Sequence, residues 1–255
     1  MNLIFSLALL AQSSSCYKPN TATLESHLSA MEIYAQIFSH DALSISNYLF
    51  AFILLRAAWT APWRSFWGNN QQFSALIGLA LWLTVLWLFP VGVREGLKLH
   101  PLGATLCFLI FDWQIASLML SMILLVSLLH NGTSILALGN IGLVMIILPI
   151  AVSRLFLKLF YRYGKANYFI FVWWNGYVCG ALTMLLASLV NGWLIMASGK
   201  YSGFTMDNVY WAFLPTIISI ESVLTGVFIS GFAIALPNAV THFNPDIYFA
   251  KKPPD

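Results

Sequence analysis

The chain has 255 residues, of which 60% are hydrophobic and only 8% are charged. A soluble domain needs a solvated surface and carries about 25% charged residues, so this composition excludes an ordinary soluble protein. The net charge of +3 comes from basic residues that stand between apolar runs and form no stripe, which argues against a nucleic-acid interface. The composition therefore predicts an all-α, polytopic membrane helix bundle.

The first residues do not follow the membrane pattern. A short apolar stretch is followed by a Ser-rich one, and the basic start of a signal peptide is missing. We therefore interpret residues 1–36 as an N-terminal extension and leave open whether Met1 or Met31 is the true start. The membrane domain is expected over residues 37–238, with a cytoplasmic tail over 239–255.

Five apolar runs are long enough to cross a bilayer, which takes about 20 helical residues. They are Leu43 to Ala61, Phe73 to Val91, Ile135 to Leu157, Tyr168 to Ala197 and Tyr210 to Leu236. The segment from Leu102 to Leu129 is ambiguous, because it could form one long helix or two short helices that meet at Asp112.

The distribution of basic residues decides between these alternatives, since Lys and Arg collect in cytoplasmic loops. The basic residues expected inside are Arg64, the cluster Arg154, Lys158, Arg162 and Lys165, and the C-terminal Lys251 and Lys252. All of them share one side only if Leu102 to Leu129 crosses twice. We therefore predict about seven helices, with the N-terminus outside, the C-terminus inside, and a short third helix that turns at Asp112.

Glu221 lies near the middle of the last apolar run, where a carboxylate facing lipid would be costly. It must face the protein interior, and it either makes a structural hydrogen bond to a neighbouring helix or acts on substrate or coupling. Arg56 in the first run is a possible ion partner, although an arginine there can also extend its charged end to the membrane surface.

Three histidines, His40, His100 and His130, fall at predicted outer helix ends and could form a transition-metal site. A single interfacial histidine is more often solvated or a helix cap, and this alternative applies to His40 and His130. In the sixth span, Gly176 and Gly180 have the spacing that lets helices approach closely, and we interpret them as packing residues.

No motif of soluble-type catalysis or ATP binding occurs in the sequence. The chain is therefore not expected to be an enzyme, and an ATPase motor would have to be supplied by another chain. An intramembrane enzyme that uses Glu221 with a histidine is a weaker alternative, because Glu221 is predicted at mid-membrane and the histidines near the outer face.

Three blocks, within a span from about Phe38 to Tyr248, carry a resemblance to the membrane substrate-capture component of energy-coupling-factor ABC transporters of the cobalt and nickel uptake type. They are Leu99-His100-Pro101-Leu102-Gly103-Ala104, Ala137-Leu138-Gly139-Asn140 and Glu221-Ser222-Val223-Leu224-Thr225-Gly226. The chain looks closest to a shorter branch of that family.

The resemblance implies a seven-helix subunit of the bacterial cytoplasmic membrane with a metal pocket on its outer side. His100 matches the histidine that binds Co²⁺ or Ni²⁺, and His40 and His130 are candidates for further ligands. Asn140, Asp112 and Glu221 are the candidate substrate or coupling residues, and we expect the two short helices that meet at Asp112 to form the floor of the pocket. The implied partners are a transmembrane coupling subunit and two ATPase subunits, with Co²⁺ or Ni²⁺ as transported substrate and no permanently bound cofactor.

The sequence departs from this family at the N-terminal Met-His that supplies further ligands in the cobalt and nickel members. Met1 is followed by Asn2, and Met31 by Glu32. The Asn140 block is also one residue shorter than the family's Ala-Leu-Gly-x-Asn. Two alternatives to cobalt or nickel uptake therefore stay open: a different small substrate, and a scaffold or sensor that keeps the fold without transport.

Overall fold

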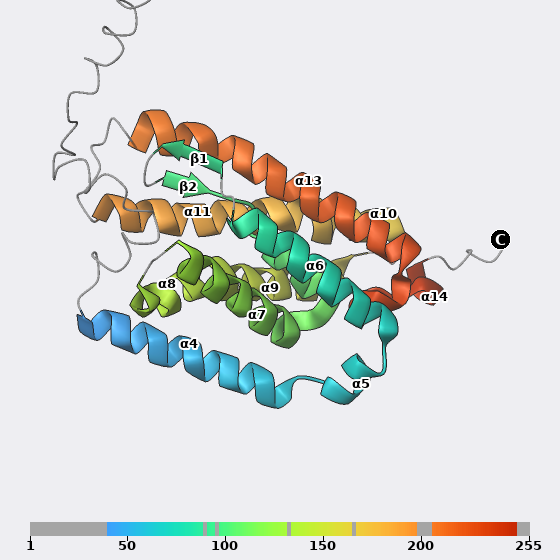
Figure 1. Cartoon of the computed structure of the whole chain (residues 1–255). Coiled ribbons are helices and arrows are strands. Elements are labelled where there is room, and N and C mark those ends of the chain that lie inside the picture. Colours follow the sequence, from blue (N-terminus) through green and yellow to red (C-terminus); the bar gives the residue numbers. More distant parts are fainter. Residues whose placement is uncertain are drawn as a thin grey trace, which may run out of the picture.

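The computed structural model describes residues 40–88, 91–94, 97–131, 134–164, 167–197 and 206–248, and it shows an elongated bundle of long helices (Figure 1). The predicted extension 1–36 lies outside these residues. The long helices are α4 (His40–Thr60), α6 (Asn70–Leu88), α7 (Ala104–His130), α9 (Leu148–Tyr163), α11 (Cys179–Ala197) and α13 (Ala212–Ala235). The short helices are α5 (Trp63–Trp67), η2 (Ile135–Ala137), α8 (Leu138–Gly142), η3 (Leu143–Ile147), α10 (Tyr168–Phe171), η4 (Val172–Val178), η5 (Met206–Trp211), η6 (Pro237–Ala239) and α14 (Pro245–Tyr248).

Within the described residues, six helical stretches are long and apolar enough to cross a membrane. This finding confirms the predicted polytopic helix bundle, whereas the predicted orientation and the count of seven spans stay predictions. The five long apolar runs each coincide with one of these stretches. The second run ends earlier than predicted, since α6 stops at Leu88 and β1 (Val91–Arg94) pairs antiparallel with β2 (Leu97–Leu99).

The outer surface of the bundle is apolar, as a lipid-facing surface requires. Phe52, Leu81 and Val227 on three different helices are more than half exposed, and Trp59 is 90% exposed at the end of α4. Arg56 is exposed as well, so it is not enclosed with Glu221 in the interior. Its position fits the alternative in which its charged end reaches the membrane surface.

Helix α7 changes direction at Asp112, whose φ of 64° lies in the left-handed region inside an otherwise helical segment. The ring of Phe111 lies 6.4 Å from that of Phe66 in α5, at one end of the bundle. Ser127 in the second part of α7 donates to the carbonyl of Trp87, at the end of α6. The chain therefore runs from the hairpin end of the bundle, where β1 and β2 lie, to the α5 end and back, as predicted for a short helix that turns at Asp112.

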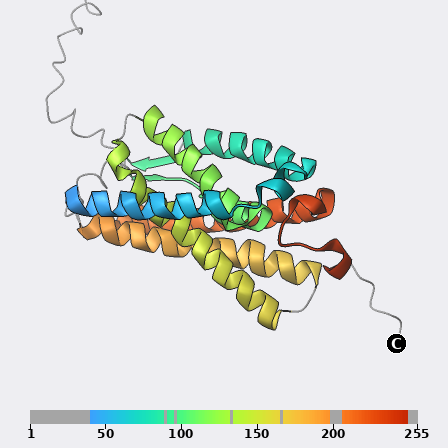
Figure 2. The same cartoon turned by 90° about the horizontal axis from the view of Figure 1, so that it is seen from below.

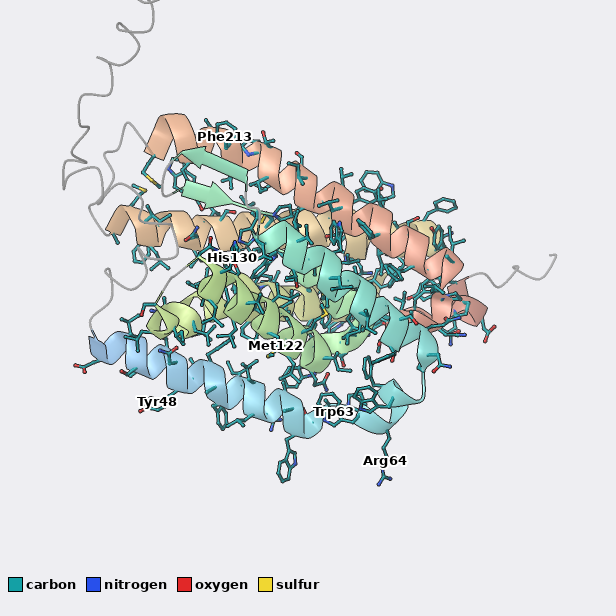
Figure 3. All side chains as sticks on the ribbon, in the orientation of Figure 1. Tyr48, Trp63, Arg64, Met122, His130 and Phe213 are labelled. Carbon is teal, nitrogen blue, oxygen red and sulfur yellow. The ribbon has the colours of Figure 1, made fainter. Side chains whose placement is uncertain are left out.

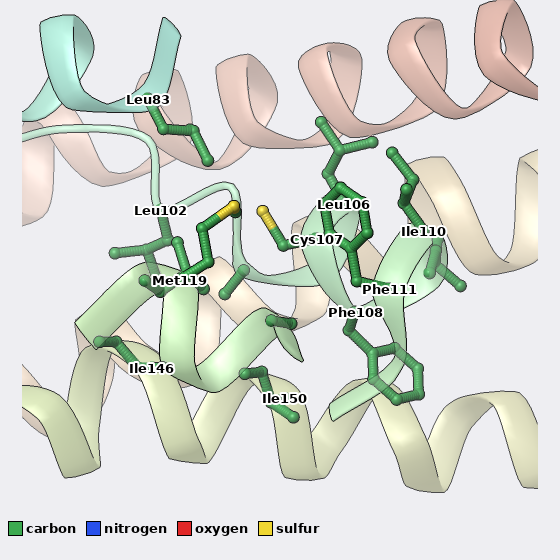
Figure 4. Packing of buried hydrophobic residues seen from close by; sticks show 14 of the residues in the cluster. Leu83, Leu102, Leu106, Cys107, Phe108, Ile110, Phe111, Met119, Ile146 and Ile150 are labelled. Carbon is green, nitrogen blue, oxygen red and sulfur yellow. The ribbon is translucent and has the colours of Figure 1, made fainter. Parts of the chain in front are cut away.

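The interior is filled by apolar side chains from both parts of α7 and from its neighbours (Figure 4). Close helix contact depends on glycine where α11 and its π-helical start η4 meet α13. A Cβ on Gly176 would lie 2.8 Å from a methyl carbon of Ile229, and one on Gly180 would lie 3.1 Å from Thr225. The prediction that these glycines serve helix packing is confirmed.

The chain after α13 folds back onto the α5 end of the bundle (Figure 2). Thr241 donates from both its amide and its hydroxyl to the carbonyl of Ile110, just before the turn in α7. The side chain of Asn69 donates to the carbonyl of Asn238. Residues 237–248, part of which we predicted as a tail, are thus bound to the helix bundle.

Candidate functional site

His100 lies between strand β2 and helix α7 and is only 5% exposed. Its ring packs against the indole of Trp87, with 4.7 Å between the centroids. Its Nδ1 lies 3.2 Å from the carbonyl oxygen of Pro101. Burial, aromatic packing and this polar contact together hold the imidazole in one place at the hairpin end of the bundle.

The contact with Pro101 also determines which ring nitrogen is free. A carbonyl oxygen only accepts hydrogen bonds, so the contact requires the proton on Nδ1 and leaves the lone pair on Nε2. Metal-binding histidines in proteins commonly donate their second ring N–H to a backbone carbonyl in this way. Burial lowers the pKa of His100, which favours the neutral imidazole that a metal ion requires.

A small cavity of about 20 Å³ lies beside His100 and has room for roughly one water-sized body. Its walls come from the segment before α7, from the π-helical turn η3 and from α11. The other lining residues are Leu102, Met145, Met184, Ala187, Ser188 and Asn191.

Glu221 fixes the backbone of the segment that carries His100. Its two carboxylate oxygens accept hydrogen bonds from the amides of Leu102, at 2.8 Å, and Gly103, at 3.0 Å. The side chain is 1% exposed and lines a second small cavity, separate from the one beside His100. Glu221 therefore acts on the site through the backbone, and its carboxylate oxygens are occupied by two amide donors.

Gly103 is the residue that allows this arrangement. Its φ of 66° is a left-handed conformation that L-residues with a Cβ adopt at a cost. A Cβ at this position would also lie 2.6 Å from a methyl carbon of Leu83 in α6. The glycine in the His-x-x-Gly block thus caps the start of α7 and lets α6 pack against the site.

Asn140 lies in α8 and is buried, and its amide nitrogen has no hydrogen-bond partner among the described residues. The preceding Gly139 packs directly on α4, since a Cβ there would meet the backbone of Asn47 at 2.6 Å. Asn47 accepts from the amide of Gly139 and donates to the carbonyl of Leu136. Asn47 thus bonds the first long helix to the Ala137–Asn140 block and to the residue before it.

The other predicted ligands are not among the residues that line the cavity. His130 is exposed at the last position of α7, on the side of the bundle away from Arg64 (Figure 3). His40 is the first residue of α4, and the structure does not describe its side chain. Of the three histidines, the described part of the chain places only His100 against the cavity.

Asp112 lies at the far end of the short part of α7, about 12 Å of helix from Ala104. Its carboxylate accepts from the amide of Trp113 at 2.7 Å and lies 3.5 Å from Nε2 of His242. It does not line the cavity beside His100. The structure therefore places Asp112 at the turn of α7 and beside the C-terminal segment.

No group of three or more His, Cys, Asp or Glu side chains that could hold a metal is found among the residues that the structure describes. The donors that accompany His100 at the cavity include Met145 and Met184, which the sequence analysis did not single out. The sequence spacing of a methionine inside an apolar run does not distinguish a metal ligand from a packing residue. The sequence therefore offered no signal for Met145 and Met184.

Comparison with known proteins agrees with this architecture. A family described as "Cobalt uptake substrate-specific transmembrane region" matches residues 32–241 of the chain. A solved structure described as that of a truncated transition metal transporter superimposes with a TM-score of 0.59 at 20% identity, covering 80% of this chain and 96% of that one. No match was found among curated protein sequences.

Proposed function

The chain belongs to the cobalt uptake substrate-specific transmembrane family, and from this premise we propose that it is the membrane component that captures a transition-metal cation for uptake. The cation is bound beside His100, and Co²⁺ and Ni²⁺ are the first cations to test. The likeness to a transition metal transporter supports the same class of cargo.

The observation that carries this proposal is the environment of His100. The imidazole of His100 is buried, is oriented by Trp87 and Pro101, and lies beside a cavity the size of one water molecule. Such an imidazole is suited to bind a dehydrated cation. Glu221 holds the same segment in place through two backbone amides. Ligands held by such supporting contacts bind metal more tightly than mobile ones.

The same proposal assigns the remaining steps of transport to other chains. The sequence carries no phosphate-binding motif, so ATP hydrolysis belongs to ATPase subunits that act through a transmembrane coupling subunit, as in energy-coupling-factor transporters. The hairpin end with His100 would face the outside of a bacterial cytoplasmic membrane, and the α5 end would face these partners. The chain itself then has no enzymatic step and no permanently bound cofactor.

The test is titration of the purified full chain in detergent with Co²⁺ and with Ni²⁺. We expect about one bound ion. His100→Ala and His100→Gln, of which the second keeps more of the side-chain volume, should each lose more affinity than the roughly 10- to 100-fold typical of removing a contact that only supports a ligand. The matched control is His130→Ala, because His130 is exposed and outside the cavity. Binding unchanged in both His100 variants, or no binding by the wild-type chain, would contradict the proposal and favour a scaffold or sensor.

A further inference from the structure

The cavity beside His100 combines one imidazole with two thioethers. Met145 comes from the π-helical turn η3, and Met184 comes from α11 and is only 3% exposed. The three side chains belong to separate elements that meet at this cavity. Thioether sulfur is a soft, polarisable donor that prefers soft cations such as Cu(I) to hard divalent ions.

The oxygen-bearing side chains that line the cavity, Ser188 and Asn191, are both neutral. The amide of Asn191 donates to the hydroxyl of Tyr210, and that hydroxyl donates to the carbonyl of Ser188. Both oxygens of Glu221 accept from the amides of Leu102 and Gly103, and this carboxylate lines a different cavity. The cavity is therefore lined, in the part of the chain that the structure describes, without an acidic side chain.

The absence of a carboxylate among these described lining residues bears on the charge of the cation. The free energy of moving an ion out of water rises with the square of its charge, so a divalent ion in a site of neutral ligands costs about four times as much as a monovalent ion of the same size. A neutral set of one nitrogen and two sulfur donors thus favours a monovalent cation on charge as well as on softness.

We propose that this cavity selects a monovalent soft cation of the Cu(I) class, bound by His100 together with Met145 and Met184. The inference rests on the proposed function, because the cavity is the capture site described above. It adds that the two methionines, more than the histidine, determine which cation the site prefers.

The experiment compares Ag⁺, a probe that does not change oxidation state under these conditions, with Co²⁺ and Ni²⁺ on the full chain in detergent. The test variant is the double substitution Met145→Leu/Met184→Leu, which keeps volume and removes both sulfur atoms. The matched controls are Met119→Leu, buried but outside the cavity, and Met122→Leu, 63% exposed. Cysteine thiols bind Ag⁺ more tightly than thioethers do, so the chain taken as wild type in this experiment, and every variant of it, has all three cysteines replaced by serine.

We expect the wild-type chain to bind Ag⁺ more tightly than Co²⁺ or Ni²⁺, and the double variant to lose at least about tenfold in Ag⁺ affinity while its Co²⁺ affinity changes little. The two controls should bind Ag⁺ as the wild type does. Equal Ag⁺ affinity in the double variant and the wild type would overturn the inference. If His100→Ala nevertheless abolished Co²⁺ or Ni²⁺ binding, the proposed function would stand and only the preference for a monovalent soft cation would fall.

Discussion

Glu221 and Gly103 lie 118 residues apart in the sequence, yet the amide of Gly103 donates to the carboxylate of Glu221 at 3.0 Å. The neighbouring amide of Leu102 donates to the other oxygen of the same carboxylate. These two amides belong to the segment that leads into α7, where the first N–H groups of a helix have no partner within the helix. A side chain from the last long helix therefore completes the start of the segment that positions His100.

The first prediction concerns this carboxylate. Glu221→Ala leaves two buried amides without an acceptor, at about 1–3 kcal/mol each, so the variant should lose about 2–6 kcal/mol of unfolding free energy. Glu221→Gln keeps one acceptor oxygen and should lose about half as much. Both should also weaken metal binding, because the His100 segment is no longer fixed. Denaturant titration in mixed micelles and metal titration measure the two effects.

The matched control for Glu221 is its neighbour. Ser222→Ala removes a single hydrogen bond from its hydroxyl to the carbonyl of Tyr177 and does not touch the His100 segment. It should lower the unfolding free energy by about 1 kcal/mol and leave metal affinity unchanged. Glu221→Ala with wild-type stability and wild-type metal affinity would show that the carboxylate does not support the site.

The second prediction concerns Gly103. Gly103→Ala adds a methyl group 2.6 Å from Leu83 and places an L-residue at φ 66°, so it should destabilise the chain by about 2–4 kcal/mol. In the double variant with Leu83→Ala, the clash is removed and the backbone cost of about 1–2 kcal/mol remains. A double-mutant cycle of unfolding free energies separates the two contributions. Additive losses would contradict the close packing of Leu83 on Gly103.

Much of the architecture could be predicted from the sequence, because a lipid-spanning helix has to be a long apolar run. The turn at Asp112 was also predicted, from the expectation that Lys and Arg share one side of the membrane. The non-helical backbone at Asp112 confirms the turn, whereas the double crossing stays a prediction. The hairpin of β1 and β2 was missed because Val91 continues the apolar pattern of the preceding span. Hydropathy records how apolar a residue is and does not record where the helix ends.

The site was predictable only in part. His100 was singled out by its local block, and Glu221 by the cost of a carboxylate in lipid. The contact between Glu221 and the Leu102 and Gly103 amides could not be predicted, because it joins segments from different helices and one partner is backbone. Likewise, Met184 contributes to the cavity only through the packing of α11 against the His100 segment, which single-sequence spacing does not contain.

The third prediction concerns a buried cluster of hydroxyls just past the start of α7. The hydroxyl of Thr105 lies 3.0 Å from that of Ser153 and 2.8 Å from that of Thr183. The hydroxyls of Ser153 and Thr183 each also donate to a backbone carbonyl of their own helix. After Thr105→Val both hydroxyls therefore keep a hydrogen-bond acceptor. The loss should be small, about 0.5–1.5 kcal/mol of unfolding free energy.

Thr84→Val is the control for this cluster, because the hydroxyl of Thr84 bonds only within α6, to the carbonyl of Ala80. Thr84→Val should lower the unfolding free energy by no more than Thr105→Val does in the same denaturant titration in micelles. A loss for Thr105→Val well above about 3 kcal/mol would show that the three hydroxyls act as one cooperative network in which no member is dispensable.

The last prediction concerns Asp112 at the turn of α7. Its φ of 64° with a ψ of 171° is a conformation that glycine adopts and that costs other residues about 1–3 kcal/mol, and its carboxylate accepts from the amide of Trp113. Asp112→Ala keeps the backbone cost and loses the hydrogen bond, worth about 1 kcal/mol, whereas Asp112→Gly loses the bond but relieves the backbone. Asp112→Asn keeps the bond and the backbone cost, and it loses the negative charge that lies beside His242.

The expected order of stability in the Asp112 series is therefore Gly above Asn above Ala. Gly should equal or exceed the wild type, and Ala should lie about 1 kcal/mol below the wild type because the wild-type aspartate already bears the backbone cost. Denaturant titration of the three variants in the same micelles gives the order. Asp112→Ala as the most stable of the three would contradict the left-handed turn. Because Thr241 bonds to Ile110 just before this turn, a destabilised turn should also expose the C-terminal segment to protease, which gel analysis of limited digests would reveal.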